Sequence, residues 1–275
     1  MLSTFENTKL KAANGDAEAQ NYLGWAYANG EGVAQNSIEA AKWYQKAAEQ
    51  GHAKAQSSLG NMYLNGKGLP RDYQHAMYWH SKAADQGYAY GQRSLGWMYE
   101  KGYGVKRDFT KAVEWYLKAA EQEDSQAQRC LGWMFHKGYG VDRDHEKAFY
   151  WYRKAAEQGD ASAQFALGLA YSFGRGVKCD QEEAAHWVRK SAGQGYASAQ
   201  WELGMWHLLA QGVPRDKVTA SFWLSMAVKN GVGKVTRVLF YRALRLSLTK
   251  AQRVEVRKRV QEWTTKTAPL ARELR

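Results

Sequence analysis

The feature that most constrains the fold of this 275-residue chain is a unit of 36 residues that recurs six times without an insertion or a deletion. A unit of this length cannot bury its own apolar face, so such units stack and each one covers its neighbour. The repetition therefore predicts a solenoid. We place the six units at residues 15–50, 51–86, 87–122, 123–158, 159–194 and 195–230.

The first half of each unit has the spacing of an amphipathic helix. In the first unit, Ala19, Leu23 and Tyr27 are four residues apart and share one helix face. Gln20, which recurs in every unit, falls on the packed side, where its amide needs hydrogen-bond partners. These residues predict a helix that packs closely against its neighbours.

A second helix follows a glycine turn in each unit. The pair Gly30 and Gly32 allows the positive φ that a sharp reversal needs, and Asn36 is placed to cap the next helix. In that helix Trp43 falls between two alanines on one face, so its equivalents are predicted to be core rings. These are Trp43, Trp79, Trp115, Trp151, Trp187 and Trp223.

Both ends of the array are predicted to be helical caps, since the end units must shield an apolar face from water. Residues 1–14 form the N-terminal cap. Residues 231–275 form a basic C-terminal cap, with helices expected at 232–246 and 250–263. In the second of these, Val256, Val260 and Trp263 suggest an apolar face, and the opposite side is assigned Arg253, Arg257 and Lys258.

The net charge of +12 is concentrated at the C-terminal end. Residues 231–275 hold 12 Lys and Arg against 3 Asp and Glu, a charge of +9, which leaves +3 for residues 1–230. The repeats are therefore nearly neutral. An electrostatic partner would belong first to the C-terminal cap, although a cluster of like charges is more often a solvated face.

The chain resembles the Sel-one-like repeat (SLR) family, a relative of the tetratricopeptide repeat, across residues 15–230. The resemblance rests on the pattern A-x-A-Q-x-x-L-G-x-x-Y-x-x-G-x-G-V and on the later Ala and Trp-Tyr positions, in six copies in register. The sixth copy departs from it, with His207 in place of the tyrosine and Ala210 in place of the first turn glycine. It implies an all-α fold, a right-handed α/α superhelical solenoid whose first helices line a concave groove. Members of the family are mostly adaptors that bind proteins.

No motif predicts an active site, a cofactor site or a metal site. The seven histidines are scattered, and none belongs to an HExxH motif or to a Cys/His set with zinc spacing. The turn glycines lack the preceding strand and the further glycines of a phosphate loop. We therefore predict a protein that is not an enzyme and has no catalytic residues, cofactor or metal.

The composition also bears on the compartment. No window approaches the run of about 18 apolar residues that a membrane span requires, and residues 1–16 lack the apolar stretch of a secretory signal. Two cysteines are too few for a disulfide framework. We expect a cytoplasmic protein without a transmembrane segment.

The residues most informative about function are those that the repeat pattern leaves free to vary on the predicted concave face. Exposed Trp and Arg side chains in a groove are typical of binding hot spots. The alternative is that these rings pack between neighbouring first helices. The predicted partner-binding residues are Trp25, Tyr90, Arg93, Trp97, Arg129, Trp133, His136 and Trp201.

The leading functional prediction is an adaptor or scaffold that binds a peptide or helix of a protein partner in the concave groove. The alternative is binding of nucleic acid, or of an acidic partner, through the basic C-terminal cap. A glycan on the same aromatic groove is a third possibility that the sequence does not separate from a peptide. Arg93 with Trp97 and Arg129 with Trp133, each four residues apart, are predicted to form the centre of the groove.

Overall fold

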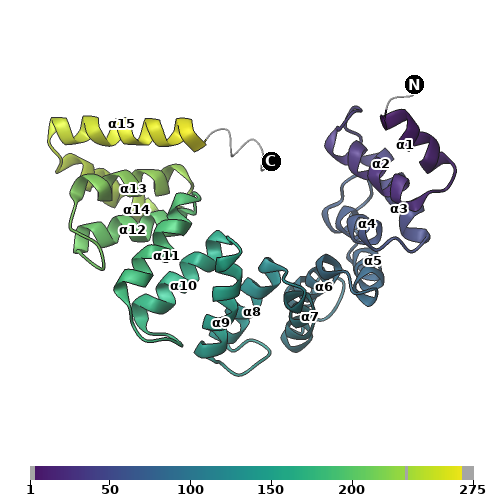
Figure 1. Cartoon of the computed structure of the whole chain (residues 1–275), viewed down its shortest axis with the longest axis horizontal. Coiled ribbons are helices and arrows are strands. Elements are labelled where there is room, and N and C mark those ends of the chain that lie inside the picture. The colour runs from purple at the N-terminus through teal and green to yellow at the C-terminus, as the bar shows by residue number, and fades with distance from the viewer. Residues whose placement is uncertain (1–3, 233–234, 268–275) are drawn as a thin grey trace. The chain divides into compact units, whose positions relative to one another are not determined.

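A computed structural model describes residues 4–232 and 235–267, and all regular structure in this part of the chain is helical (Figure 1). The chain divides into two compact units, the first ending at Arg143 and the second beginning at Asp144. The helices of the first unit are α1 (Thr4–Ala13), α2 (Ala17–Asn29), α3 (Ser37–Glu49), α4 (Ala53–Asn65), α5 (Tyr73–Asp85), α6 (Ala89–Lys101), α7 (Phe109–Glu121) and α8 (Ser125–Lys137).

The second unit continues the same alternation of helices. Its helices are α9 (His145–Glu157), α10 (Ala161–Phe173), α11 (Gln181–Gly193), α12 (Ala197–Leu209), α13 (Lys217–Lys229), α14 (Val235–Leu246) and α15 (Lys250–Thr267). The helix pair predicted for each repeat is thereby confirmed. The predicted caps also include residues 1–3, 233–234 and 268–275, which lie outside the described part of the chain.

Local sequence determines where the helices of a repeat begin and end. The side chain of Asn36 accepts hydrogen bonds from the Ile38 and Glu39 amides at the start of α3, and aspartates do the same for the other second helices. The first helix α2 ends at Gly30, whose φ of 77° lies in the left-handed region. In the sixth repeat Ala210 takes this conformation with φ 58°, which is uncommon for a residue with a Cβ.

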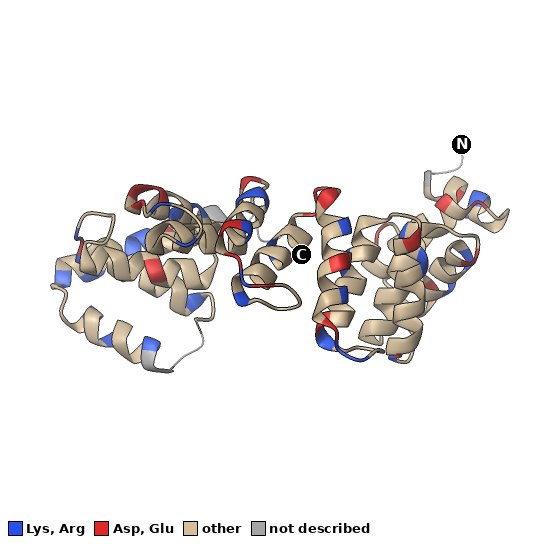
Figure 2. Cartoon of the chain, turned by 90° about the horizontal axis from the view of Figure 1, so that it is seen from below, with Lys and Arg blue, Asp and Glu red and all other residues tan. Residues whose placement is uncertain are grey.

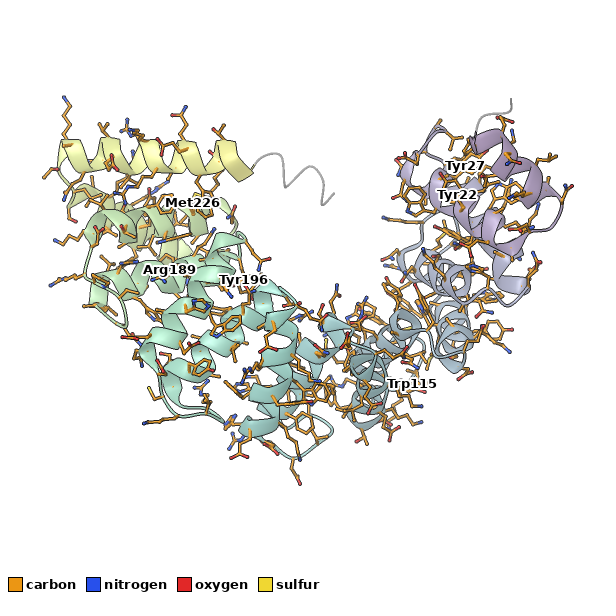
Figure 3. The ribbon with its side chains drawn as sticks, in the orientation of Figure 1. Tyr22, Tyr27, Trp115, Arg189, Tyr196 and Met226 are labelled. Atoms are coloured by element: carbon orange, nitrogen blue, oxygen red, sulfur yellow. The ribbon has the colours of Figure 1, made fainter. Side chains whose placement is uncertain are left out.

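The tryptophans predicted to be core rings are half-buried in five of the six repeats, and only Trp223 is buried. Trp115, for example, is half-buried on α7, and the Lys118 ammonium lies 4.2 Å from the centre of its ring (Figure 3). The core position is instead the next residue of each second helix. The buried residues at this position are Tyr44, His80, Tyr116, Tyr152, Val188 and Leu224.

The glycine of the first helix explains why this next residue is the buried one. A Cβ placed on Gly24 would lie 2.6 Å from the Tyr44 ring, and one on Gly96 would lie 2.7 Å from the Tyr116 ring. The absence of a side chain at the glycine lets the second helix pack a large residue directly against the first. The tryptophan one residue earlier is rotated about 100° away, toward the edge of this contact.

The recurring glutamine is buried and makes two hydrogen bonds, as its place on the packed side predicted. In the second repeat, Gln56 Nε2 donates to the Ala48 carbonyl over 3.1 Å, and Gln56 Oε1 accepts from Gln86 Nε2 over 2.7 Å. Gln20 and Gln92 make the same pair of bonds in the first unit, as do Gln164 and Gln200 in the second. In the last case Asn230 is the donor. These bonds satisfy buried amides that would otherwise destabilise the core.

The C-terminal helices pack on the last repeat. The Trp263 ring of α15 lies 5.4 Å from that of Trp223, and a capping box joins Thr249 to Gln252. The assignment of Arg253 and Arg257 to the side opposite the apolar face was wrong. Both line a pocket that Val256 and Val260 also line, because residues three, four and seven apart share a helix face.

Lys and Arg lie beside Asp and Glu at many places along the repeats of each unit (Figure 2). Residues 1–230 are therefore nearly neutral because charges of opposite sign lie close together on their surface. No helix in the described part of the chain is long and apolar enough to cross a membrane.

Candidate partner-binding surface

Trp97 on α6 belongs to a group of three aromatic rings. Its ring meets that of Tyr103 edge to face, with centroids 5.0 Å apart, and Tyr103 stacks on Tyr73 at 4.7 Å with an angle of 9° between the planes. The Arg71 guanidinium lies 5.8 Å from the centre of the Tyr73 ring. We call Tyr73, Trp97 and Tyr103 the Trp97 triad.

The next repeat has an equivalent group, the Trp133 triad, formed by Phe109, Trp133 and Tyr139. Trp133 meets Tyr139 edge to face at 4.9 Å, and Tyr139 stacks on Phe109 at 4.9 Å with an interplanar angle of 17°. Arg107 lies 5.2 Å from the centre of the Phe109 ring. Each triad therefore combines edge and stacked contacts, which aromatic rings favour, with a guanidinium at its end.

The chain positions these rings through the turn between the two helices of a repeat. Tyr103 stands between Gly102 and Gly104, where α6 ends and the chain reverses. A Cβ on Gly104 would overlap the Tyr73 backbone, so the turn passes directly over the start of α5. This close approach brings Tyr103 into stacking distance of a residue of the preceding repeat.

Arg93, predicted to lie beside Trp97 in the groove, forms a link between two repeats. Its Nε donates to Asp124 Oδ2 over 3.0 Å and its Nη1 to Gln126 Oε1 over 2.8 Å. The guanidinium also lies 4.6 Å from the centre of the Tyr90 ring. With about four-fifths of each charged side chain covered, this ion pair is shielded from the solvent screening that weakens surface pairs.

The other predicted site residues have more varied surroundings. Trp25 is exposed on α2, with its ring 5.7 Å from that of Tyr22. Arg129 and His136 are half-buried on α8. Trp201 belongs to the second unit, where Phe240 and Arg237 of α14 contact its ring at 6.0 and 5.2 Å.

The structure thus brings several of the predicted residues together in the first unit. Tyr90 and Arg93 are in contact, and Asp124, the partner of Arg93, caps α8, the helix that carries Arg129, Trp133 and His136. Trp25 lies beside Tyr22 instead, and Trp201 lies beside Phe240 and Arg237. Their role in partner binding, like that of the whole set, stays a prediction.

Sequence reasoning missed four rings of the triads: Tyr73, Tyr103, Phe109 and Tyr139. A signal was present in the repeat alignment. The residue between the turn glycines is Glu31, Lys67 or Arg175 in other repeats and tyrosine only in the third and fourth. Variation at a position that the fold does not restrict can point to a surface with another role.

The first unit also contains a buried histidine in its core. His80 is fully buried in the core of the second repeat, with Nδ1 3.2 Å from Ser57 Oγ. Burial, with a smaller contribution from the Arg93 charge, lowers the pKa of His80 to about 4. The ring is therefore neutral at pH 7. No group of His, Cys, Asp and Glu with the arrangement of a metal site occurs in the described ranges.

Comparison with known proteins identifies the class. Helix pairs with capped ends, buried glutamines and glycine turns define a repeat solenoid of the tetratricopeptide type. Six consecutive segments match the Sel1 repeat, at residues 17–52, 53–88, 89–124, 125–160, 161–196 and 197–232. The chain belongs to the Sel1 repeat family, and the resemblance inferred from the sequence is confirmed. Sel1 repeat proteins are generally scaffolds for protein interactions and bind protein partners.

Solved structures agree with this assignment. A Sel1 repeat protein from Oxalobacter formigenes is 37% identical over 79% of this chain and 89% of its own, with a TM-score of 0.75. A protective antigen present in uropathogenic Escherichia coli strains, which displays an SLR fold, is 33% identical with a TM-score of 0.60. That match covers 97% of this chain and 65% of the antigen's. No curated protein sequence matches the chain.

Proposed function

We propose that this protein is an adaptor that binds a peptide or helix of a protein partner on the surface of α6 and α8. The observation that carries the proposal is the repetition of the Trp97 triad as the Trp133 triad, each ending at an arginine. Trp, Tyr and Arg are the residue types most enriched among those that dominate binding energy in protein interfaces.

The repeat fold does not require these aromatic residues. At the position of Trp97 the second, fifth and sixth repeats carry Asn61, Leu169 and Met205, and their first helices form with similar turns. The first repeat carries Trp25 there, but Glu31 rather than tyrosine in its turn. Packing within a repeat therefore leaves the identity of this residue open. Two adjacent repeats that both place a tryptophan here, with a tyrosine in the turn, support a role in binding.

The chemistry of the surface indicates what kind of segment it would bind. Indole and phenol rings offer flat apolar faces, while Arg71 and Arg107 add cationic groups at the ends of the triads. Aromatic side chains of a partner can stack on the rings, and carboxylates can pair with the guanidinium groups. Since Arg93 is already paired with Asp124, its contribution is to hold this surface in shape rather than to contact the partner directly.

The proposal is tested by crosslinking and affinity purification of the full chain from its native cell, followed by affinity measurements with the captured partner. Trp97→Ala and Trp133→Ala are each compared with wild type. Tyr78→Ala is the control, because Tyr78 is a large exposed aromatic residue of the same unit that belongs to neither triad. Loss of a binding hot spot weakens affinity by about thirtyfold or more.

Weaker binding by both Trp variants, with unchanged melting and a normal Tyr78→Ala control, supports the proposal. A large fall in melting temperature with binding per folded molecule preserved would show that the rings serve packing alone. Recovery of nucleic acid, with an affinity that falls steeply and linearly in log salt, would favour the alternative site on the basic C-terminal cap.

A further inference from the structure

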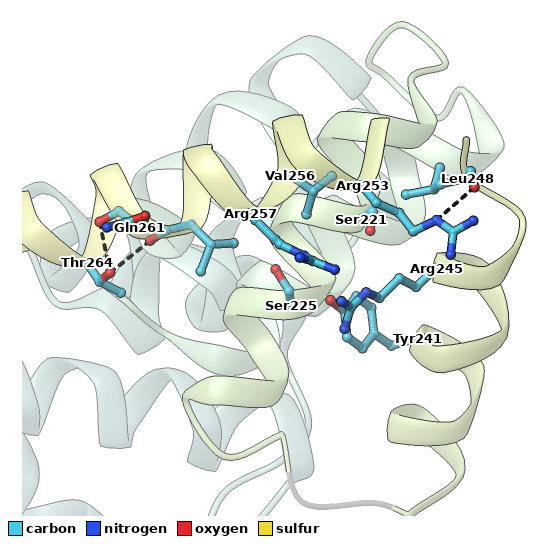
Figure 4. A pocket seen from close by; sticks show the side chains of 11 residues that line it. Ser221, Ser225, Tyr241, Arg245, Leu248, Arg253, Val256, Arg257, Gln261 and Thr264 are labelled. Carbon is cyan, nitrogen blue, oxygen red and sulfur yellow. Dashed lines mark hydrogen bonds between the residues drawn. The ribbon is translucent and has the colours of Figure 1, made fainter. Parts of the chain in front are cut away.

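A pocket of about 310 Å³ lies in the second unit between α13, α14 and α15 (Figure 4). This volume is at the lower end of the range for small-molecule sites. Helix α15 is held against α13 on the same side, because Arg259 Nη1 donates to Thr219 Oγ1 over 3.2 Å and Trp263 contacts Trp223. Two of the walls are therefore joined by specific contacts.

Three arginines line this pocket, and no acidic residue lines it among the residues that the structure describes. The Nε of Arg253 donates to the Leu248 carbonyl over 3.1 Å, which fixes that side chain. Arg245 and Arg257 extend toward one another at the exposed mouth (Figure 4). Neither has a carboxylate partner within the described ranges, so this mouth favours an anion.

The inner part of the pocket combines an unpaired hydroxyl with apolar side chains. Ser221 is fully buried, and its Oγ has no hydrogen-bond partner in the described part of the chain. A buried hydroxyl without a partner is costly, and native proteins rarely leave one. Leu248, Val256 and Val260 line the pocket around it. The pocket thus has a cationic mouth, an apolar lining and one hydroxyl available at depth.

We propose that this pocket binds a small amphipathic anion, in which a carboxylate or phosphate group is joined to an apolar body. The anionic group would lie between Arg245 and Arg257, and the apolar body would contact Val256 and Val260. This site belongs to the second unit. It is thus separate from the surface of α6 and α8 proposed for the protein partner.

Calorimetric titration of the full chain with hexyl phosphate and with hexanoate tests the proposal. Hexanol, which has the apolar chain without a charge, and inorganic phosphate, which has the charge without an apolar chain, are the control ligands. Arg245→Gln and Arg257→Gln each remove one mouth cation. Arg189→Gln removes an equal charge from an exposed position of α11 in the same unit, outside the pocket (Figure 3). Circular dichroism and melting curves establish that each variant is folded.

We expect saturable binding of at least one of the two amphipathic anions. Arg245→Gln and Arg257→Gln should each weaken its affinity about tenfold or more, because each removes a charge-assisted hydrogen bond. Arg189→Gln should leave the affinity unchanged. Preference for hexyl phosphate or for hexanoate identifies the anionic group. The proposal is overturned if neither anion binds up to about 10 mM, beyond the millimolar end of the affinity scale. Equal affinity for hexanol or for inorganic phosphate, or an equal loss in Arg189→Gln, also overturns it.

Discussion

Arg93 and Asp124 form an ion pair between consecutive repeats, with 3.0 Å between Nε and Oδ2, and the same aspartate caps the helix that follows it. The pair connects α6, which carries Trp97, to the start of α8, which carries Trp133. One carboxylate thus serves both the end of a helix and the junction between two repeats. The position of the two tryptophans relative to each other depends on this contact.

Removing the guanidinium should therefore destabilise the first unit. We expect Arg93→Ala to lower the free energy of unfolding by about 1.5–3 kcal/mol, the value of a hydrogen bond to a charged group. Chemical denaturation of Arg93→Ala, Asp124→Ser and the double variant measures the coupling, since serine retains the cap. If the two single effects simply add, the pair contributes no coupling energy.

His80 should make the stability of the first unit depend on pH. The folded protein keeps the ring neutral down to about pH 4, whereas in the unfolded chain it takes up a proton below about pH 6.5. Lowering the pH through this window therefore favours unfolding, by up to about 3 kcal/mol. Denaturation at several pH values should show the loss below pH 6.5.

The control for this prediction is His80→Tyr, because tyrosine occupies the same buried position at Tyr44, Tyr116 and Tyr152. This variant should remain folded and should lose less stability between pH 6.5 and pH 4 than the wild type. Parallel curves for the two proteins would show that groups other than His80 cause the pH dependence.

The neighbouring residues Trp115 and Tyr116 should differ in their cost of truncation. Tyr116 is fully buried against Gly96, and its hydroxyl donates to Glu100 Oε2 over 2.8 Å. We expect Tyr116→Ala to lower the free energy of unfolding by about 3–5 kcal/mol, as other large-to-small core changes do. Trp115→Ala should lower it less. Equilibrium unfolding monitored by hydrogen exchange resolves the two effects in α7. The opposite ranking would contradict the burial described above.

Substitutions at two turn glycines can distinguish the energetic cost of backbone strain from the cost of steric overlap. Both Gly51 and Gly68 have positive φ, of 89° and 73°. A Cβ on Gly51 meets nothing within 4 Å, whereas one on Gly68 would overlap the Ser37 carbonyl. Gly51→Ala should lower the free energy of unfolding by about 1–2 kcal/mol, because of its backbone conformation alone. Gly68→Ala should lower it clearly more. Equal melting temperatures for the two variants would show that the chain at Ser37 yields easily.

Deleting residues 231–275 should expose the apolar side of the last repeat. Phe222 and Trp223 lose their contacts with Trp263, whose ring lies 5.9 and 5.4 Å from theirs. We expect the truncated protein to aggregate, which size-exclusion chromatography and light scattering detect. A monomeric truncation with unchanged helicity would mean that the C-terminal helices are an appendage rather than a cap.

The helices and their boundaries were predictable because they depend on residues close together in the sequence. Asp72 caps α5 and Gly66 ends α4 through contacts that span only a few residues. The 36-residue period then places the same caps and turns in every repeat. Six copies of one pattern make each assignment support the others.

Burial and the candidate surface were less predictable, because they depend on how each helix is rotated and on contacts between repeats. Trp115 and Tyr116 differ by one residue, about 100° around the helix, and the interhelical contact decides which is buried. Tyr103 meets Tyr73 thirty residues earlier because a turn crosses the preceding repeat. The place of Arg257 beside a pocket likewise depends on how α15 lies against α13.

The buried glutamines determine how the chain can change in length. Gln56 bonds to a carbonyl eight residues before it and to Gln86 thirty residues after it, and Gln92 repeats both separations in the next unit. Insertion of a complete 36-residue copy preserves these separations and supplies every new amide with its partners. A single residue added within α5 would instead move Gln86 away from Gln56. The array can therefore grow or shrink by whole repeats, whereas small insertions are confined to places outside the helices.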